Sequence, residues 1–287
     1  MSVTDIHFHG IAGLSTKTSS FEEILQIAKV AYVYGVEKIV LSVYPGPIEK
    51  MRKNMEAIKR AMEEQSKINK PKEQATILGI HLEGPFLNKK RSGALNKRYF
   101  LDPDEKIFEA LVEGFEDFVK IMTLAPELKG SPTLIKKIRD RGILVSMGHS
   151  EATYSEAEEG YRKGASCITH IFNAMRGIHH RELGIAGFGL LNRDIFIEVI
   201  GDLEHLHIKT IELIFRLKRR DRIILISDSH KGTMLEDKGV RKMGKLKGGA
   251  LPLALAAKKL VEYGIEETAI WGAVTENPLF FLSQNSS

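Results

Sequence analysis

Six histidine and carboxylate side chains stand at the ends of apolar runs in this sequence. Two of the histidines form an H-x-H pair, and residues two apart on a strand point to the same side. The six residues are His7, His9, Glu83, His149, His170 and Asp228. Imidazoles and carboxylates without a thiolate suit one or two divalent ions such as Zn²⁺, Fe²⁺, Co²⁺ or Mn²⁺. A single histidine at a strand end is usually an ordinary polar group, but six such residues together indicate a metal site.

Short, nearly continuously apolar runs alternate with longer helical patterns along the chain. The runs cover residues 3–9, 38–43, 76–83, 117–125, 142–149, 165–172, 195–201 and 222–228. The helical patterns cover residues 20–34, 47–69, 131–141, 154–163, 205–219, 252–263 and 275–283. Continuous apolar runs are typical of parallel strands that are covered on the outside. Eight such alternations predict a TIM (β/α)8 barrel over residues 1–287, with a doubly wound open sheet as the alternative.

A barrel would bring the six candidate residues together. Each lies at the carboxyl end of its run, and in a barrel these ends meet on one face, where barrel enzymes keep their active sites. The carboxylate of Glu83 ends a buried strand and therefore needs a partner for its charge. A metal ion on the shared face would supply the missing counter-charge.

Bulk composition limits the class of protein. The chain has 287 residues, of which 43 % are hydrophobic, enough for a large core. A net charge of +5 and a pI near 9.1 are compatible with phosphate-bearing substrates or nucleic acid and identify neither. The single cysteine, Cys167, excludes a disulfide framework and suits a reducing compartment. No signal-peptide pattern and no apolar run near the ~20 residues of a membrane span are present, so we expect a cytoplasmic protein.

Longer motifs around the candidate residues carry a resemblance to a known family. The stretches are DIHFHG (5–10), GIHLEGPF (79–86), MGHSEATY (147–154), THIFNAM (169–175), HHRELGIAGFGLL (179–191) and LISDS (225–229). They are similar to motifs of the amidohydrolase superfamily, and within it to those of N-acetylglucosamine-6-phosphate deacetylases. The resemblance implies a TIM barrel. It also implies a metal-dependent hydrolase that removes the acetyl group from an amino-sugar phosphate, most of all N-acetylglucosamine 6-phosphate.

The resemblance also implies roles for the metal-site residues. Glu83, His149 and His170 would hold one ion. The H-x-H pair would help to hold a second ion that shares Glu83. Asp228 would lie beside the metal and act as the general acid and base.

Further residues are implied to bind the substrate. They are Asn173, Ala174, Arg181 and His205. Asn173 and the backbone of Ala174 would grip the phosphate, and His205 would contact the sugar phosphate. Arg181 would reach the phosphate bound in a neighbouring subunit, which implies a homodimer. Judged from its residues alone, Arg181 could equally form a surface salt bridge with Glu182 or another acid.

The sequence departs from the family pattern on the substrate side. The small β-sandwich domain that usually accompanies the barrel is expected to be absent. Leu95 stands where the motif has a substrate-contacting histidine. Leu203 and Glu204 replace smaller residues beside the expected phosphate pocket. These changes spare the expected metal site and Asp228.

Two other functions remain open on the sequence. Single-domain barrels with the same ligand pattern include metal-dependent nucleases, and the basic pI would suit one. The stretches THIFNAM and HHREL argue against nucleic acid as the substrate. The second alternative is a barrel that binds metal and sugar phosphate without turnover, and the retention of every ligand and of Asp228 argues against it.

Overall fold

The computed structural model describes residues 2–67, 73–235, 241–242 and 245–284. The last part of the predicted helix 47–69 and part of the loop at 230–250 lie outside these residues.

Eight parallel strands form a single ring. In pairing order they are β1 (Thr4–Phe8), β4 (Lys38–Val43), β5 (Thr76–Glu83), β6 (Val119–Leu124), β7 (Leu144–Met147), β8 (Ala165–Ile168), β9 (Phe196–Ile200) and β10 (Ile223–Ile226). The ring closes just beyond β1 and β10, where the N–H of His9 donates to the carbonyl oxygen of Ser229 at 2.7 Å. The predicted TIM barrel is therefore confirmed. The doubly wound alternative is wrong, because the first and last strands of an open sheet would not meet.

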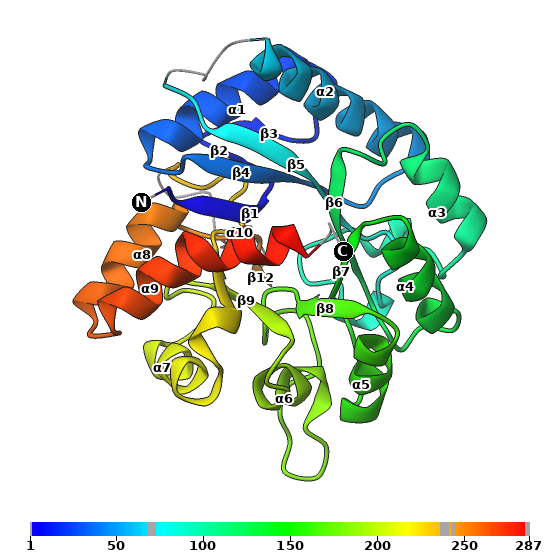
Figure 1. Ribbon diagram of the computed structural model, residues 1–287, viewed down its shortest axis with the longest axis vertical. Helices are drawn as coiled ribbons and strands as arrows, with labels where there is room; N and C mark the ends of the chain where they lie inside the picture. Colours follow the sequence, from blue (N-terminus) through cyan, green and yellow to red (C-terminus); the bar gives the residue numbers. More distant parts are fainter. Residues whose placement is uncertain (1, 68–72, 236–240, 243–244, 285–287) are drawn as a thin grey trace.

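Helices surround the ring (Figure 1). Those that match the predicted segments are α1 (Phe21–Val33), α2 (Ile48–Ser66), α4 (Ser131–Asp140), α5 (Tyr154–Arg162), α7 (Ile208–Leu217), α8 (Leu253–Glu262) and α10 (Glu276–Ser283). The structure adds α3 (Glu105–Val112), α6 (Gly184–Leu191) and α9 (Glu267–Val274). Side-chain caps begin several of these helices: the Ser20 hydroxyl accepts the N–H of Glu23, and Thr153 forms a capping box with Glu156. No helix among the described residues is long and apolar enough to cross a membrane.

The core has two parts. A large cluster fills the space between the strands and the outer helices. A smaller cluster fills the inside of the barrel, with a side chain from every strand of the ring and Phe281 from α10. Helix α10 lies across the centre of the view in Figure 1. The Asn277 side chain donates to carbonyl oxygens at the start of β10, including that of Ile223 at 2.7 Å. Helix α10 therefore closes the amino-terminal end of the barrel and leaves the carboxyl ends of the strands open for the site.

Short elements shape the open end. The hairpin of β2 (Gly10–Ile11) and β3 (Leu14–Ser15) follows β1 directly. A second hairpin, β11 (Arg241–Lys242) with β12 (Lys245–Leu246), follows β10. Both hairpins lie in loops that leave the carboxyl ends of strands, where barrel proteins place the residues that contact ligands.

Candidate active site

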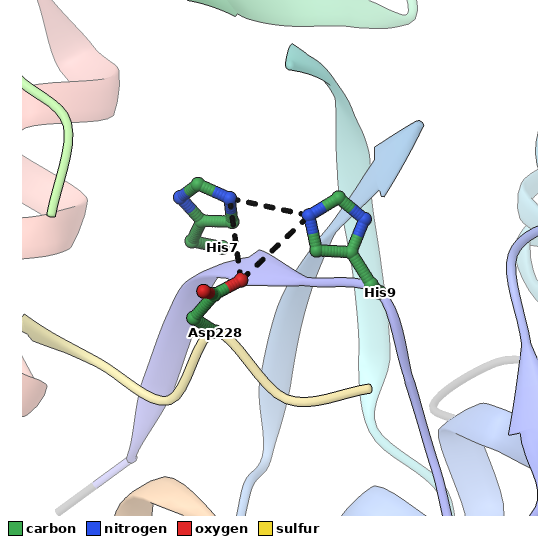
Figure 2. A group of neighbouring side chains, drawn as sticks. All are labelled: His7, His9 and Asp228. Atoms are coloured by element: carbon green, nitrogen blue, oxygen red, sulfur yellow. Dashed lines mark hydrogen bonds and ion pairs between the residues drawn. The ribbon is translucent and has the colours of Figure 1, made fainter. Parts of the chain in front are cut away.

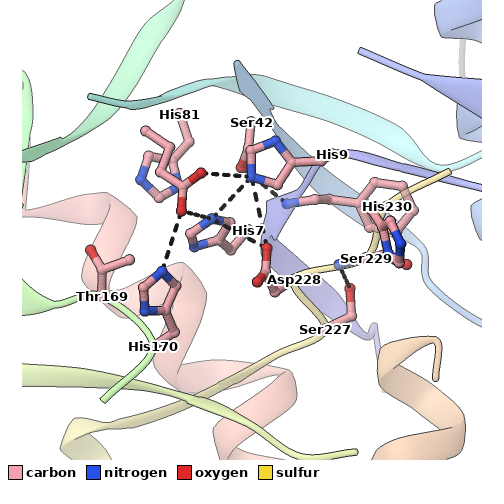
Figure 3. Close-up of polar contacts among 12 residues, drawn as sticks. His7, His9, Ser42, His81, Thr169, His170, Ser227, Asp228, Ser229 and His230 are labelled. Atoms are coloured by element: carbon pink, nitrogen blue, oxygen red, sulfur yellow. Dashed lines mark hydrogen bonds and ion pairs between the residues drawn. The ribbon is translucent and has the colours of Figure 1, made fainter. Parts of the chain in front are cut away.

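The structure brings the six predicted metal-site residues together at the carboxyl ends of the strands. Two groups of possible ligands adjoin one another: His7, His9 and Asp228 form one, and Glu83, His149 and His170 form the other. Figure 2 shows the first group, in which the Nε2 atoms of His7 and His9 are 3.3 Å apart and both face Asp228. In Figure 3, His9 and His170 lie on either side of His7.

Glu83 is the centre of this arrangement. Its Oε1 atom lies 3.1 Å from Nε2 of His149, 3.3 Å from Nε2 of His170 and 3.4 Å from Nε2 of His7. Its Oε2 atom lies 3.3 Å from Nε2 of His9. The carboxylate is almost fully buried, so water cannot solvate its charge. Four imidazoles thus surround one desolvated carboxylate, with three rings facing Oε1 and one facing Oε2.

Hydrogen bonds on the side of the rings away from Glu83 decide which nitrogen carries the proton in His149 and His7. Nδ1 of His149 lies 2.8 Å from the carbonyl oxygen of Arg91, which can only accept, so Nδ1 carries the proton. Nδ1 of His7 lies 3.0 Å from the carboxylate of Glu198 and donates in the same way. In their neutral forms both histidines then turn an Nε2 lone pair toward Glu83. Two facing acceptors need a cation between them, so the residues present fit a bound divalent metal ion.

A polar layer beneath the ligands supports them. Nε2 of His81 lies 2.8 Å from the Thr123 hydroxyl, and Nδ1 lies 3.2 Å from a backbone carbonyl, so both of its nitrogens are engaged. The Thr169 hydroxyl bonds those of Thr123 and Ser146. Figure 3 shows His81 and Thr169 next to the ligands. His81, His7 and Glu198 could by position form a third ligand group, but the partners of His81 make it part of the support.

Backbone geometry turns several ligands into the cavity. His149, His170 and Asp228 have φ angles of +47°, +29° and +48°, in the left-handed region that residues with a side chain seldom adopt. Such conformations cluster at functional sites and are held there by the surrounding structure. Asp5 provides one such restraint, because its carboxylate accepts the N–H groups of His7 and Ser227 and so ties β1 to the segment that carries Asp228.

Burial and mutual charge shift the pKa values of the site. Burial raises the pKa of Asp228 to about 7, a shift that the Glu83 charge reinforces and His7 opposes. For Glu83 burial acts in the same direction, but the four facing histidines, which can donate to it when they are protonated in the metal-free site, hold its pKa well below the usual range. Burial lowers the pKa of His9 to about 4. Burial also acts to lower the pKa of His7, but the facing carboxylates of Glu198, Glu83 and Asp228 together raise it well above its usual range. A carboxyl group with a pKa near neutrality can both accept and release a proton.

Most of the residues implied to bind the substrate lie around the same space. A cavity of about 360 Å³ opens over the ligands, and Asn173, Ala174 and His205 line it. Nδ1 of His205 lies 2.9 Å from Oδ2 of Asp202. Burial opposes a charge on this ring, but the bond to Asp202 and its negative charge raise the pKa of His205. A protonated imidazole at this position suits an anionic ligand.

Arg181 is placed elsewhere. It lies in an exposed turn, residues 177–181, and it does not line the cavity. The carboxylate of Glu182 accepts the N–H groups of Tyr154 and Gly184, and among the described residues it has no ion pair with Arg181. Within a single chain the structure therefore gives no support to a salt bridge between Arg181 and Glu182.

The three positions that depart from the family pattern lie in different places relative to the cavity. Leu95 lines the cavity, as expected for the position of the replaced histidine. Leu203 and Glu204 stand beside the cavity and not in its wall, and the negative charge of Glu204 acts on the cavity-lining His205. Leu203 packs against the outer core with a φ of +65°, and Glu204 is exposed, so neither lines the cavity.

Several residues of the site were missed in the sequence. Glu198 is the clearest, because a carboxylate inside the apolar strand IFIEVIG is itself a signal of a buried polar contact. Tyr44, directly after the strand KIVLSV, lines the cavity. The carbonyl of Arg91 left no signal, because any residue could supply a backbone oxygen.

Fold and donor set together define the class: a TIM-barrel protein with a candidate metal site at the carboxyl ends of its strands. The chain belongs to the amidohydrolase family, whose model matches residues 2–258.

Known relatives carry names that bear on function. The chain is 35 % identical over 243 residues to an N-acetylglucosamine-6-phosphate deacetylase from Bacillus subtilis, covering 84 % of this chain and 60 % of that protein. It is 33 % identical over 226 residues to one from Lysinibacillus sphaericus, covering 78 % and 57 %. The crystal structure of the Thermotoga maritima N-acetylglucosamine-6-phosphate deacetylase superposes with a TM-score of 0.88 at 27 % identity, covering 99 % of this chain and 78 % of that one. The match therefore spans less than two thirds of the two sequence relatives.

Replacing His149 by Ala should remove metal. We expect the affinity for Zn²⁺ to fall by more than the about 10- to 100-fold typical of losing a group that only supports a ligand. Elemental analysis and zinc titration calorimetry would measure the change. His207→Asn is the matched control, because it replaces an exposed histidine at the start of α7 by another residue that can cap the helix. Equal zinc affinity in both variants would show that His149 is not a ligand.

Asp228 should make the metal-free protein less stable as the pH rises. Its folded pKa of about 7 exceeds the value of about 3.9 in an unfolded chain, so between these values the folded state holds the extra proton. Stability from this group is therefore lost as the pH rises from about 4 to about 7. Metal-free Asp228→Asn should gain stability relative to wild type over that window, as measured by urea unfolding in EDTA. A difference that stays constant with pH, as for the exposed control Asp102→Asn, would contradict this assignment.

Proposed function

We propose that this chain removes the N-acetyl group from an amino-sugar phosphate, first of all N-acetylglucosamine 6-phosphate, to give acetate and glucosamine 6-phosphate. The observation that carries the proposal is the ring of four imidazoles around Glu83, next to Asp228, under a cavity of about 360 Å³. The names of the relatives support the choice of reaction and substrate.

The candidate ligands would hold one or two divalent ions. Such an ion lowers the pKa of a water molecule and polarises the acyl carbonyl. Asp228 would accept the proton of the attacking water and then give it to the amine as the C–N bond breaks. Its pKa of about 7 without metal would fall once a cation is near, which favours the ionised form that must act first as a base.

The phosphate would bind in the part of the cavity that His205, Asn173 and Ala174 line. His205 supplies positive charge there, because Asp202 raises its pKa. Asn173 and the backbone N–H of Ala174 would add neutral donors, and both residues line the cavity. A phosphate is recognised by this combination of a cation and N–H groups.

Arg181 would complete the phosphate site from a second copy of the chain. The exposed turn at 177–181 carries Arg181 away from the cavity of its own barrel. A homodimer would allow the turn to reach the cavity of its partner, where a guanidinium could pair with the phosphate. The homodimer is part of the proposal.

Acetate release tests the proposed reaction. Wild type and Asp228→Asn would be assayed side by side with N-acetylglucosamine 6-phosphate and its galactosamine epimer, after bound metal is measured in each. We expect wild-type turnover, and a fall of about 10²- to 10⁴-fold in kcat in the variant if it retains metal, because it lacks the general acid and base. Metal-loaded wild type that releases no acetate from either sugar would overturn the proposal.

Complementation tests the role of Arg181. Arg181→Met should raise KM for the phosphorylated sugar by about 10-fold or more, because it loses one charge-assisted contact. Mixing Arg181→Met with Asp228→Asn subunits should restore activity, since in a mixed dimer the intact Asp228 site receives Arg181 from its neighbour. Arg216→Met, which removes an exposed arginine on α7, serves as the control. Loss of activity with no recovery on mixing would place Arg181 in its own chain's site or exclude it from function.

A further inference from the structure

The ring of Tyr44 is held firmly beside the candidate metal site. Tyr44 follows β4, and its ring stacks on that of His9 with centroids 3.8 Å apart and planes inclined by 20°. The Nζ atom of Lys17 lies over the same ring, 4.0 Å from its centroid. Two groups this close to one centroid must occupy opposite faces, so the ring is sandwiched between a cation and a candidate ligand. This packing fixes the plane in which the hydroxyl lies.

The hydroxyl of Tyr44 is available for a ligand. Among the described residues it has no hydrogen-bond partner. Tyr44 lines the cavity together with His9, Glu83 and Asp228. A phenol has an ordinary pKa of about 10, so near neutral pH the hydroxyl carries its proton and can donate it in a hydrogen bond.

The proposed reaction calls for a hydrogen-bond donor in the cavity. Hydrolysis of an amide places negative charge on the acyl oxygen, and a donor aimed at that oxygen stabilises the transition state. At the position where the family motif has a histidine, this chain presents the apolar side chain of Leu95 to the cavity. The apolar side chain of Ile200 also lines the cavity. Tyr44 is a neutral donor that directly contacts a candidate metal ligand, and so lies next to the place where the bond is cleaved.

We propose that the Tyr44 hydroxyl donates a hydrogen bond to the acyl oxygen as this oxygen becomes an oxyanion. The proposal rests on the proposed function for its substrate. As the water oxygen bonds to the acyl carbon, the π pair of the carbonyl moves to the acyl oxygen, and Tyr44 keeps its proton throughout. When the C–N bond breaks, that pair re-forms the carbonyl, and the amine leaves with the proton from Asp228. Tyr44 would thus supply a donor that Leu95 cannot.

Tyr44→Phe tests this role with little change in packing, because the ring and its contacts with His9 and Lys17 remain. We expect kcat to fall about 10²-fold, the loss typical of removing one oxyanion donor, while KM and the metal content stay near wild type. Tyr161→Phe is the control, because it also loses a tyrosine hydroxyl but lies in α5, where its ring packs on Phe188. Equal kcat in wild type and Tyr44→Phe would overturn the proposal and leave the proposed reaction intact.

Methylphosphonate gives a second measurement that does not depend on the sugar. It presents a methyl group and tetrahedral oxyanions to the metal-loaded site, as the acetyl carbon does during hydrolysis. We expect its Kd, measured by calorimetry, to rise about 10-fold in Tyr44→Phe and to stay unchanged in Tyr161→Phe. An unchanged Kd in Tyr44→Phe would also overturn the proposal. If wild type releases no acetate from either sugar, the proposed substrate is wrong, and this binding comparison still decides the role of Tyr44.

Discussion

The conflict between the Glu83 carboxylate and the four imidazoles around it is the constraint on which the site depends. Nδ1 of His149 and of His7 is committed to an acceptor, so in their neutral forms both rings turn an Nε2 lone pair toward Glu83, at 3.1 Å and 3.4 Å. Without a cation this geometry is tolerated only if the rings take up extra protons, which burial opposes at His9 and His170. A divalent ion removes the conflict for all the rings at once. Binding of a divalent ion would therefore also stabilise the folded arrangement of the ligands at the open end of the barrel.

The interior of the barrel stabilises the buried charges of the site. Below the ligands the inside of the ring changes from polar to apolar: His81, Thr123 and Glu198 lie near the site, and an apolar cluster ending in Phe281 lies at the other end. The polar layer keeps each ligand in one orientation, since Glu198 holds His7 and also accepts the N–H of His170 at 3.3 Å. The apolar end supplies burial that stabilises the fold without directing any ligand. Stability and orientation are thus provided by different ends of the same strands.

Sequence patterns predicted the strands and the candidate ligands because both depend on local rules. Apolar runs mark buried strands, and a charged or polar residue at the end of such a strand needs a polar or ionic partner. The missing parts had no such local signal. Helix α6 is buried nearly all round, so its sequence GIAGFGLL has no polar face from which a helical period could be recognised. The carbonyl of Arg91 orients His149 from a distant loop, a contact that only the folded chain defines. Helix α3, by contrast, begins with an Asp104 cap and could have been predicted.

The rim of the barrel shows why the substitutions in this chain need not disturb the chemistry. Leu203 adopts a φ of +65°, which suits glycine better, yet the turn is held because Asp202 accepts the N–H groups of Glu204 and His205 through Oδ1 and that of Ala250 through Oδ2. The added side chain packs outward against the core, so the cavity keeps its room. Leu95 is different, because it replaces a polar group on the cavity wall itself. A change of that kind alters the donors offered to a substrate, and it must be balanced by another donor on the same wall or by a different ligand.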